Sequence, residues 1–291
     1  MTHPASAPRF GQIAKAAPQK SALRFANAVA SGAACGVLLA LSGGALAAPH
    51  GLNFGKTEGK DLPPSAGRDA LRQIVQDQCI PRWVQHKDPA PCDRVVLADE
   101  KNLNSGYAIL ADRKGAAHYL LIPTQTMHGV DADEILNPDL PNYFAQAWSA
   151  RDVITKFVGH PVPRTAIGLA VNKAHARTQD QFHIHIDCLR QDVAEALHAG
   201  AENATTAWGP IALLGSAYQI KRIEGLSLDG ISVFESVAQI GPDVRHHIGD
   251  YTVVIAGMQY RNGAGFMLIT GTGQTGELLL DSSCAIAGAG G

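Results

Sequence analysis

The chain has 291 residues, of which 46% are hydrophobic and 17% are charged, and its formal net charge is −2. This length and hydrophobic content are sufficient for a substantial core in one large or two small domains. A nearly neutral chain lacks the excess of basic residues that general nucleic-acid binding requires, so we expect no nucleic-acid partner.

The first 55 residues have the composition of an export signal or a membrane anchor. They contain no Asp or Glu, and their Lys and Arg residues all precede residue 25. An apolar stretch follows and ends in Ala45-Leu46-Ala47, the kind of small-residue site after which a secretory signal is cleaved. The uncharged run also exceeds the roughly 20 residues that span a bilayer. We therefore expect residues 1–48 to be a cleaved signal or a retained anchor, and residues 49–64 to be a linker.

Export to an oxidising compartment changes how the cysteines are interpreted. Apart from Cys35, the chain has four: Cys79, Cys92, Cys188 and Cys284. An even number in such a compartment indicates two disulfide bonds. Three pairings are possible from the sequence alone. A Cys79–Cys92 bond would close a short Pro-rich loop and is the natural local pair, which leaves Cys188–Cys284 as the second bond.

Residues 65–291 are expected to form the folded domain. Hydrophobic periodicity of the helical kind predicts helices at residues 65–79, 142–158 and 192–197. Strand patterns bounded by turn signals lie at residues 94–98, 107–111, 117–122, 165–171, 181–189, 218–223, 231–234, 251–260, 265–270 and 277–281. Because the strands come in runs and do not alternate with helices, the predicted fold class is α+β.

Three turn signals separate these strands. Asn and Gly residues at 102–106 predict a turn after the first strand, and Arg-Asn-Gly-Ala at 261–264 predicts a hairpin. Residues 271–276 spell G-x-G-x-x-G, but the nucleotide-binding form of this motif needs the start of a helix directly after it. Since a strand is predicted there instead, we interpret these residues as a glycine-rich turn.

The segment 181–189 carries the most informative pattern in the chain. Polar and apolar residues alternate strictly, so His183, His185 and Asp187 are predicted to lie in a row on one face of a strand, with apolar residues directed into a core. Two imidazoles and a carboxylate in a row fit two chemistries. One is attack of a neutral imidazole on a phosphoryl group, and the other is ligation of zinc or manganese.

The residues around this strand resemble the histidine-triad (HIT) superfamily. The segment 117–123 reads as an apolar strand that ends in Ile-Pro and is followed by His128. Asn172 and Gln179 lie eleven and four residues before His183, as they do in that superfamily. The match in order and spacing favours the phosphoryl chemistry.

The closer resemblance is to a membrane-associated bacterial branch, CDP-diacylglycerol pyrophosphatase. It rests on the N-terminal hydrophobic segment, the Cys-bearing first helix, and the segments 168–173, 177–179 and 183–188. It is strong over residues 67–197 and loose beyond them. Asp187 stands where the wider superfamily has its third His. The resemblance implies a HIT-like antiparallel sheet with long helices and a strand-rich C-terminal extension.

The resemblance also implies a reaction: hydrolysis of the diphosphate of CDP-diacylglycerol to CMP and phosphatidate, with no metal or other cofactor. The middle His of the motif, His185, would attack the phosphorus on the nucleoside side, with His183 touching the phosphate and Asp187 in the third position. Substrate contacts are expected from Asn172, Lys173, Thr178, Gln179 and His118. The implied partners are the lipid nucleotide and a membrane, and the implied location is the periplasmic side of a bacterial inner membrane.

Two other functions are compatible with the same residues. His183, His185 and Asp187 could ligate a metal in a hydrolase similar to the metallo-β-lactamases, with His246 or His247 as a further ligand. Against this, the residue after Asp187 is not the His usual in that signature, and the metal interpretation leaves the Asn and Gln placement unexplained. The other alternative is a nucleotide-lipid binding module without catalytic activity.

Overall fold

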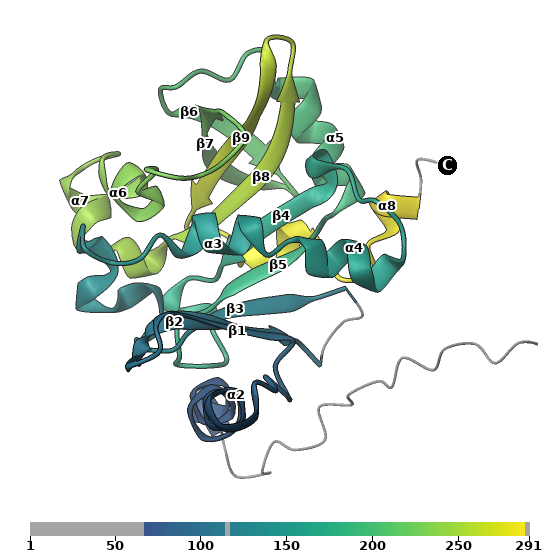
Figure 1. Ribbon diagram of the computed structural model, residues 1–291. Helices are drawn as coiled ribbons and strands as arrows, with labels where there is room; N and C mark the ends of the chain where they lie inside the picture. Colours follow the sequence, from purple (N-terminus) through teal and green to yellow (C-terminus); the bar gives the residue numbers. More distant parts are fainter. Residues whose placement is uncertain (1–66, 114–116, 289–291) are drawn as a thin grey trace, which may run out of the picture. The chain divides into compact units, whose positions relative to one another are not determined.

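The computed structural model describes residues 67–113 and 117–288 (Figure 1). The expected signal or anchor, the linker and the helix start at Ser65 lie outside these residues. Among the residues that the structure describes, no helix is both long enough and apolar enough to cross a membrane.

A ten-stranded sheet with antiparallel pairing throughout forms the centre of the fold. Its strands are β1 Arg94–Asp99, β2 Asn102–Ala111, β3 Tyr119–Pro123, β4 Ile167–Val171, β5 Ile184–Leu189, β6 Gly209–Leu213, β7 Ser216–Glu224, β8 Thr252–Tyr260, β9 Gly263–Gly271 and β10 Leu280–Asp281. They are ordered β1-β2-β3-β5-β4-β8-β9-β7-β6, and β10 pairs with β5. The α+β class is thereby confirmed. Strand β5 lies inside the sheet, between β3 and β4.

Helices and short helical turns connect and cover the strands. The α-helices are α1 Ala70–Gln73, α2 Ile80–His86, α3 Tyr143–Ser149, α4 Asp152–Val158, α5 Gln191–Gly200, α6 Val233–Ala238, α7 Pro242–His246 and α8 Ala285–Gly288. The other helical segments are η1 Gly67–Asp69, η2 Ile74–Cys79, η3 Gly129–Asp131, η4 Asp133–Leu136, η5 Arg164–Ala166, η6 Ala174–Ala176, η7 Ile248–Asp250 and η8 Gly276–Leu279. All of these η segments are 3-10 turns except η2, which is a π-helix.

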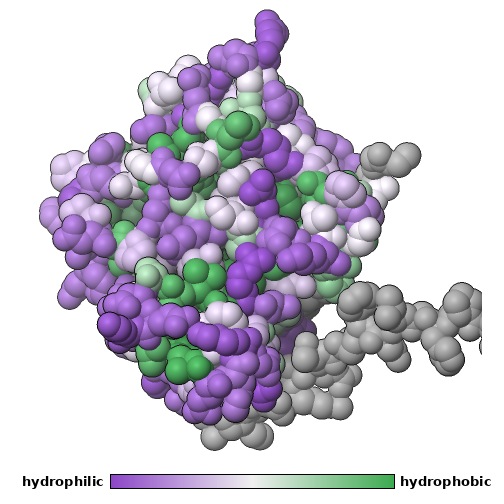
Figure 2. All heavy atoms as spheres, in the orientation of Figure 1, coloured by the Kyte–Doolittle hydropathy of each residue, from purple (hydrophilic) through white to green (hydrophobic). Residues whose placement is uncertain are grey.

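One face of the sheet is covered by α3, α4 and α6, and α3 and α4 lie in front of β4 and β5 in Figure 1. The apolar side chains of β5 that alternate toward this face, among them Ile184 and Ile186, are fully buried against these helices. The outer surface on this side carries hydrophobic residues only in small, separate patches among hydrophilic ones (Figure 2). This side of β5 therefore serves the core, as the alternation predicts.

The opposite face of the sheet is covered in two separate places. The N-terminal helical segments pack over β1 to β3, in a cluster that includes Leu120. Helix α5 and residues 279–280 pack over β4 and β7 to β9, in a cluster that includes Ala170. His185 of β5 is in register with Leu120 on one side and with Ala170 on the other. The polar side chains of β5 therefore lie between two apolar clusters.

Both expected disulfide bonds are present. Cys79 of η2 is bonded to Cys92, with the two Cα atoms 5.7 Å apart. Cys188 of β5 is bonded to Cys284, with a Cα–Cα distance of 5.1 Å and a sequence separation of 96. The second bond attaches the C-terminal segment to the strand that carries the histidines.

Two helix predictions were wrong in extent. The first helix does not end near Cys79 but continues to His86, since the π-helical turn η2 precedes Pro81, which has no amide hydrogen for a regular helix. The long helix at 142–158 is two helices, α3 and α4. At the break the Arg151 side chain donates to the Trp148 carbonyl oxygen at 2.5 Å, which the next helical turn would otherwise use.

Several strand predictions were also wrong. Residues 102–106 belong to β2 and not to a turn, and Gly106 is needed there because a Cβ atom would lie 1.8 Å from the Val96 carbonyl oxygen. Residues 231–234 are not a strand: the apolar residues that begin there recur at helical spacing and form α6. Strand β6 was missed because Gly209 and Pro210 weaken its pattern. Most of the strand predicted at 277–281 is the 3-10 turn η8.

Candidate active site

Two histidines and an aspartate meet in the space between the two apolar clusters. The ring nitrogens His118 Nε2 and His185 Nδ1 are 2.6 Å apart, and His118 Nδ1 lies 3.3 Å from Asp187 Oδ2. The exposed fractions of His118, His185 and Asp187 are 3%, 3% and 1%. His118, which precedes β3, therefore joins the two β5 residues in one buried chain of polar contacts.

On its other side His185 meets Asn172, which follows β4. Asn172 Nδ2 is 3.3 Å from His185 Nε2 and 3.2 Å from Glu277 Oε2. The backbone amide of Glu277 donates to Asn172 Oδ1 at 3.1 Å. A backbone N–H can only donate, so this bond fixes which end of the Asn172 amide is oxygen and which is nitrogen.

His183 lies beside this chain, one residue before the start of the strand. Strand β5 begins at Ile184, and Gln181 before it pairs in an isolated bridge with His128. The His183 ring centroid is 4.9 Å from that of His185, and its Nδ1 is 2.8 Å from the Gln181 carbonyl oxygen. Desolvation by the surrounding atoms lowers the pKa of His183, so its neutral form is favoured.

The electrostatic environment of Asp187 is unusual. Burial raises the pKa of its carboxyl group to about 8, and the negative charges of Asp281, Glu277 and Asp112 add to the shift. The backbone amide of Cys188 donates to Asp187 Oδ1 at 2.6 Å and opposes the shift. Asp187 therefore changes its charge near neutral pH, where an ordinary aspartate is fully ionised.

A cavity of about 390 Å³ opens beside this chain and has two of its members, His118 and Asp187, in its wall. The remaining lining residues come from the C-terminal segment: Thr275, Glu277, Leu278, Leu280 and Ser282. Leu278 is 47% exposed, so the wall also presents an apolar side chain to solvent.

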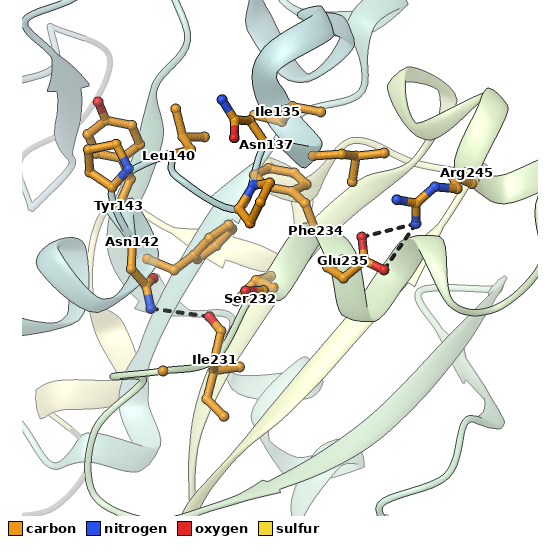
Figure 3. Close-up of a pocket in the computed structure, with 16 residues that line it drawn as sticks. Ile135, Asn137, Leu140, Asn142, Tyr143, Ile231, Ser232, Phe234, Glu235 and Arg245 are labelled. Carbon is orange, nitrogen blue, oxygen red and sulfur yellow. Dashed lines mark hydrogen bonds and ion pairs between the residues drawn. The ribbon is translucent and has the colours of Figure 1, made fainter.

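A larger cavity of about 480 Å³ lies elsewhere, between residues 135–144 and 230–245 (Figure 3). It is lined by apolar and aromatic residues such as Phe234, with the Glu235–Arg245 ion pair at its side. None of the histidines or carboxylates of the buried chain lines it. Size alone therefore does not identify the site in this protein, and the titratable groups do.

Three residues expected to contact substrate make other contacts in this structure. Gln179 binds the first helix: its Oε1 accepts from the Leu71 amide at 3.1 Å, and its Nε2 donates to the Gly67 carbonyl at 3.1 Å. Lys173 Nζ donates to backbone carbonyls of the glycine-rich turn 271–276. Thr178 is exposed in the loop between them. These residues shape the loop beside the site, while Asn172 and His118 are the two brought to His185.

The structure also offers a set of metal-type ligands, though not the one expected from the sequence. Ligand atoms of Asp112, His118 and His185 all lie within 4.8 Å of one another. His246 and His247 are exposed, and the His247 Nδ1 lies 3.0 Å from the Asp243 carbonyl oxygen. The sequence had predicted His183, His185 and Asp187 as the ligands, and of these only His185 belongs to the set in the structure.

Two residues of the site were missed in the sequence. Asp112 follows β2, and its amide donates to the His118 carbonyl oxygen at 2.8 Å, so this contact between the end of β2 and the start of β3 brings the two residues together. Asp112 could have been identified in the sequence from its position directly after a strand, where functional residues are common. Glu277 gave no local signal, because it was interpreted as part of a strand, 105 residues from its partner Asn172.

A comparison with protein families bears on this geometry. The family model described as CDP-diacylglycerol pyrophosphatase matches residues 66–288, nearly the whole of the described chain. The match extends across the C-terminal strands and includes Glu277, beyond the part where the sequence resemblance is strong. With the buried histidines and all of their partners inside the matched residues, the chain belongs to the CDP-diacylglycerol pyrophosphatase family, hydrolases that act on CDP-diacylglycerol in phospholipid metabolism.

Proposed function

We propose that this protein hydrolyses the diphosphate of CDP-diacylglycerol to CMP and phosphatidate, that His185 is the nucleophile, and that the sheet is HIT-like. The family supports the substrate and the overall reaction. The observation that carries the choice of nucleophile is the chain of hydrogen bonds that runs through His185.

The direction of each bond in that chain follows from one backbone amide. Because the Glu277 amide donates to Asn172 Oδ1, Asn172 Nδ2 is the atom that faces His185 Nε2. An amide nitrogen only donates, so His185 Nε2 accepts and carries no proton. The proton of the neutral imidazole is then on Nδ1, which donates to His118 Nε2.

The chain continues to a carboxylate. With its Nε2 accepting, His118 carries its own proton on Nδ1, which faces Asp187 Oδ2 at 3.3 Å. Ionised Asp187 thus holds His118, and His118 holds His185, in the tautomer that leaves a lone pair on His185 Nε2. An imidazole held in this way is the activated nucleophile of covalent catalysis.

The first half-reaction follows from this arrangement. His185 Nε2 forms a bond to the cytidylyl phosphorus, the bond from that phosphorus to the bridging oxygen breaks, and phosphatidate leaves with the electron pair. The imidazole ring becomes cationic and is stabilised through His118 by the charge of Asp187. Asn172 Nδ2, which now faces His185 Nε2, would donate to a phosphoryl oxygen. His183, beside the same ring, would contact the phosphate.

The location and partners that we propose are those of an exported, membrane-associated enzyme. Residues 1–48 would be the signal or anchor, residues 49–64 the linker, and residues 65–291 the catalytic domain on the periplasmic side. Two disulfide bonds support an oxidising compartment.

The experiment is to trap the covalent intermediate. The enzyme is mixed with CDP-diacylglycerol, quenched within one turnover and digested, and the peptides are examined by mass spectrometry. We expect a cytidylyl adduct on His185 and no activity in His185→Ala. His160→Ala, which removes an exposed histidine, is the matched control and should keep full activity. Near-normal turnover by His185→Ala would disprove the proposed nucleophile.

A second function is favoured by one observation, the proximity of Asp112, His118 and His185. A divalent cation held there would also offset the carboxylates around a diphosphate substrate. We place it second because the 2.6 Å between the two imidazole nitrogens fits a hydrogen bond, whereas nitrogens that share a tetrahedral zinc are about 3.3 Å apart. Activity lost on exhaustive chelation and restored by zinc or manganese would reverse this order.

A further inference from the structure

Glu277 meets the site through two contacts to the same side chain. Its backbone amide donates to Asn172 Oδ1, and its carboxylate Oε2 accepts from Asn172 Nδ2 at 3.2 Å. That nitrogen is also the one within 3.3 Å of His185 Nε2. Glu277 further lines the cavity beside His118 and Asp187. The carboxylate is therefore one amide nitrogen away from the atom proposed to carry the cytidylyl group.

The segment that carries Glu277 is held firmly on both sides. Before it, a Cβ atom on Gly276 would lie 3.1 Å from both Ala170 Cβ and the Val171 carbonyl oxygen, so the turn η8 packs directly on β4. After it, Leu279 is fully buried, and its carbonyl accepts from the Arg190 amide at 3.0 Å. A carboxylate on such a support has a fixed position toward the reacting atoms.

The second half-reaction needs a base that the rest of the site does not provide well. Water must lose a proton as it attacks the phosphorus, and His185 cannot take it while its Nε2 is bonded to that phosphorus. Asp187 is engaged by His118 and by the Cys188 amide. Glu277 is half-buried in the cavity wall, and its carboxylate is held by Asn172, which would itself contact the phosphoryl group.

We propose that Glu277 is the general base of the second half-reaction, an inference that rests on the proposed function. A water molecule in the cavity gives its proton to the Glu277 carboxylate as its oxygen bonds to the cytidylyl phosphorus. The P–N bond breaks, and the electron pair returns to His185 Nε2, which restores the neutral ring with its proton on Nδ1. CMP is released, and the proton passes from Glu277 to solvent.

The experiment measures the two half-reactions separately in Glu277→Gln. A glutamine oxygen can still accept from Asn172, so the variant keeps the hydrogen bond and loses only the basicity. We expect phosphatidate to be released in one fast burst per enzyme, followed by CMP release slowed by about 10²- to 10⁴-fold, with the adduct on His185 accumulating. Glu235→Gln, which alters a half-buried, ion-paired glutamate on α6, is the matched control and should show no accumulation.

Each alternative outcome has a distinct meaning. Equal slowing of both steps in Glu277→Gln would mean that Glu277 only positions Asn172, and normal rates of both steps would mean that it has no role in catalysis; either result overturns this inference and leaves the His185 nucleophile in place. Failure to detect an adduct in the wild-type enzyme and in the variant, together with active His185→Ala, would instead refute the proposed function.

Discussion

Asp187 couples the charge of the site to its chemistry. Burial raises the pKa of its carboxyl group to about 8, but in the proposed mechanism the lone pair on His185 Nε2 depends on an ionised Asp187, which His118 connects to His185. A protonated Asp187 can donate to His118 Nδ1. His118 Nε2 would then donate to His185 Nδ1, and the lone pair on His185 Nε2 would be lost. Burial therefore disfavours the charged form of Asp187, whereas the proposed mechanism requires that form.

We predict that activity and stability change in opposite directions with pH. In the folded protein Asp187 binds a proton between about pH 4 and pH 8 that the unfolded chain has lost, so its contribution to stability is present at low pH and declines as pH rises through this range. Activity should rise with pH toward 8, because the ionised fraction rises. Parallel pH profiles of kcat and of the melting temperature test this.

Asp187→Asn is the informative variant for that prediction. It should lower kcat strongly and remove much of the decline in stability with pH, since the titrating group is gone. An unchanged kcat profile in Asp187→Asn would show that another group controls the activity.

We infer for His118 a role that differs from the substrate contact expected from the sequence. It links His185 to Asp187, so His118→Ala should lower kcat by about 10²- to 10⁴-fold with little change in KM. A side chain that mainly binds substrate would raise KM instead. Steady-state kinetics separate the two, and a change confined to KM would return His118 to the substrate contacts.

At the scale of elements, β5 is fixed from both sides. Within the sheet it pairs with β3 and β4, and the Cys188–Cys284 bond attaches the C-terminal segment to its buried side. Cys188 also donates its amide to Asp187, so the bond lies next to the hydrogen-bonded chain. The Cys79–Cys92 bond, by contrast, joins the first helix to the start of β1.

We therefore predict different effects from the two disulfide bonds. Closing a loop of 96 residues stabilises the fold by about 4–5 kcal/mol in the chain-entropy model, so Cys188→Ala with Cys284→Ala should lower both the melting temperature and kcat. Cys79→Ala with Cys92→Ala should lower the melting temperature and affect kcat less. Equal loss of kcat in both pairs would show that the second bond has no particular connection with the site.

For the whole molecule, the sequence predicts what depends on neighbours along the chain. The alternation along β5, the helix α5 and the hairpin between β8 and β9 were all local patterns and are confirmed. The disulfide pairing was also confirmed. It could be predicted because Cys79 and Cys92 close a short loop, which leaves the other two cysteines as the second pair. The fold class followed from the order of the elements.

What the sequence did not predict depends on distant contacts. The break between α3 and α4 coincides with a hydrogen bond from the Arg151 side chain to the Trp148 carbonyl oxygen. Gln179 has the spacing of a substrate ligand but holds the first helix, more than 100 residues away. Glu277 enters the site only because β8 pairs with β4 and brings the turn after β9 to Asn172.

That pairing of β4 with β8 makes the two halves of the sheet one structure. We predict that a chain ending at residue 205, which lacks β6 to β10, forms no stable domain, because it exposes the edge of β4 and removes the apolar cluster under α5. A chain that lacks residues 1–64 should remain folded and is the control. Thermal unfolding and size-exclusion chromatography provide the measurement, and a monomeric short form with a sharp transition would contradict the prediction.

The bond between β5 and Cys284 has a consequence for when the enzyme first works. In an exported chain the C-terminal segment crosses the membrane last, and it carries both Glu277 and the cysteine that closes onto the reactive strand. A chain still in transit has not yet acquired these contacts, and a chain kept in a reducing cytoplasm lacks the disulfide bond. Hydrolysis should therefore reach its full rate only after the C-terminal segment has folded onto β5 and the bond has formed, so a newly made chain should act on CDP-diacylglycerol more slowly than the finished enzyme.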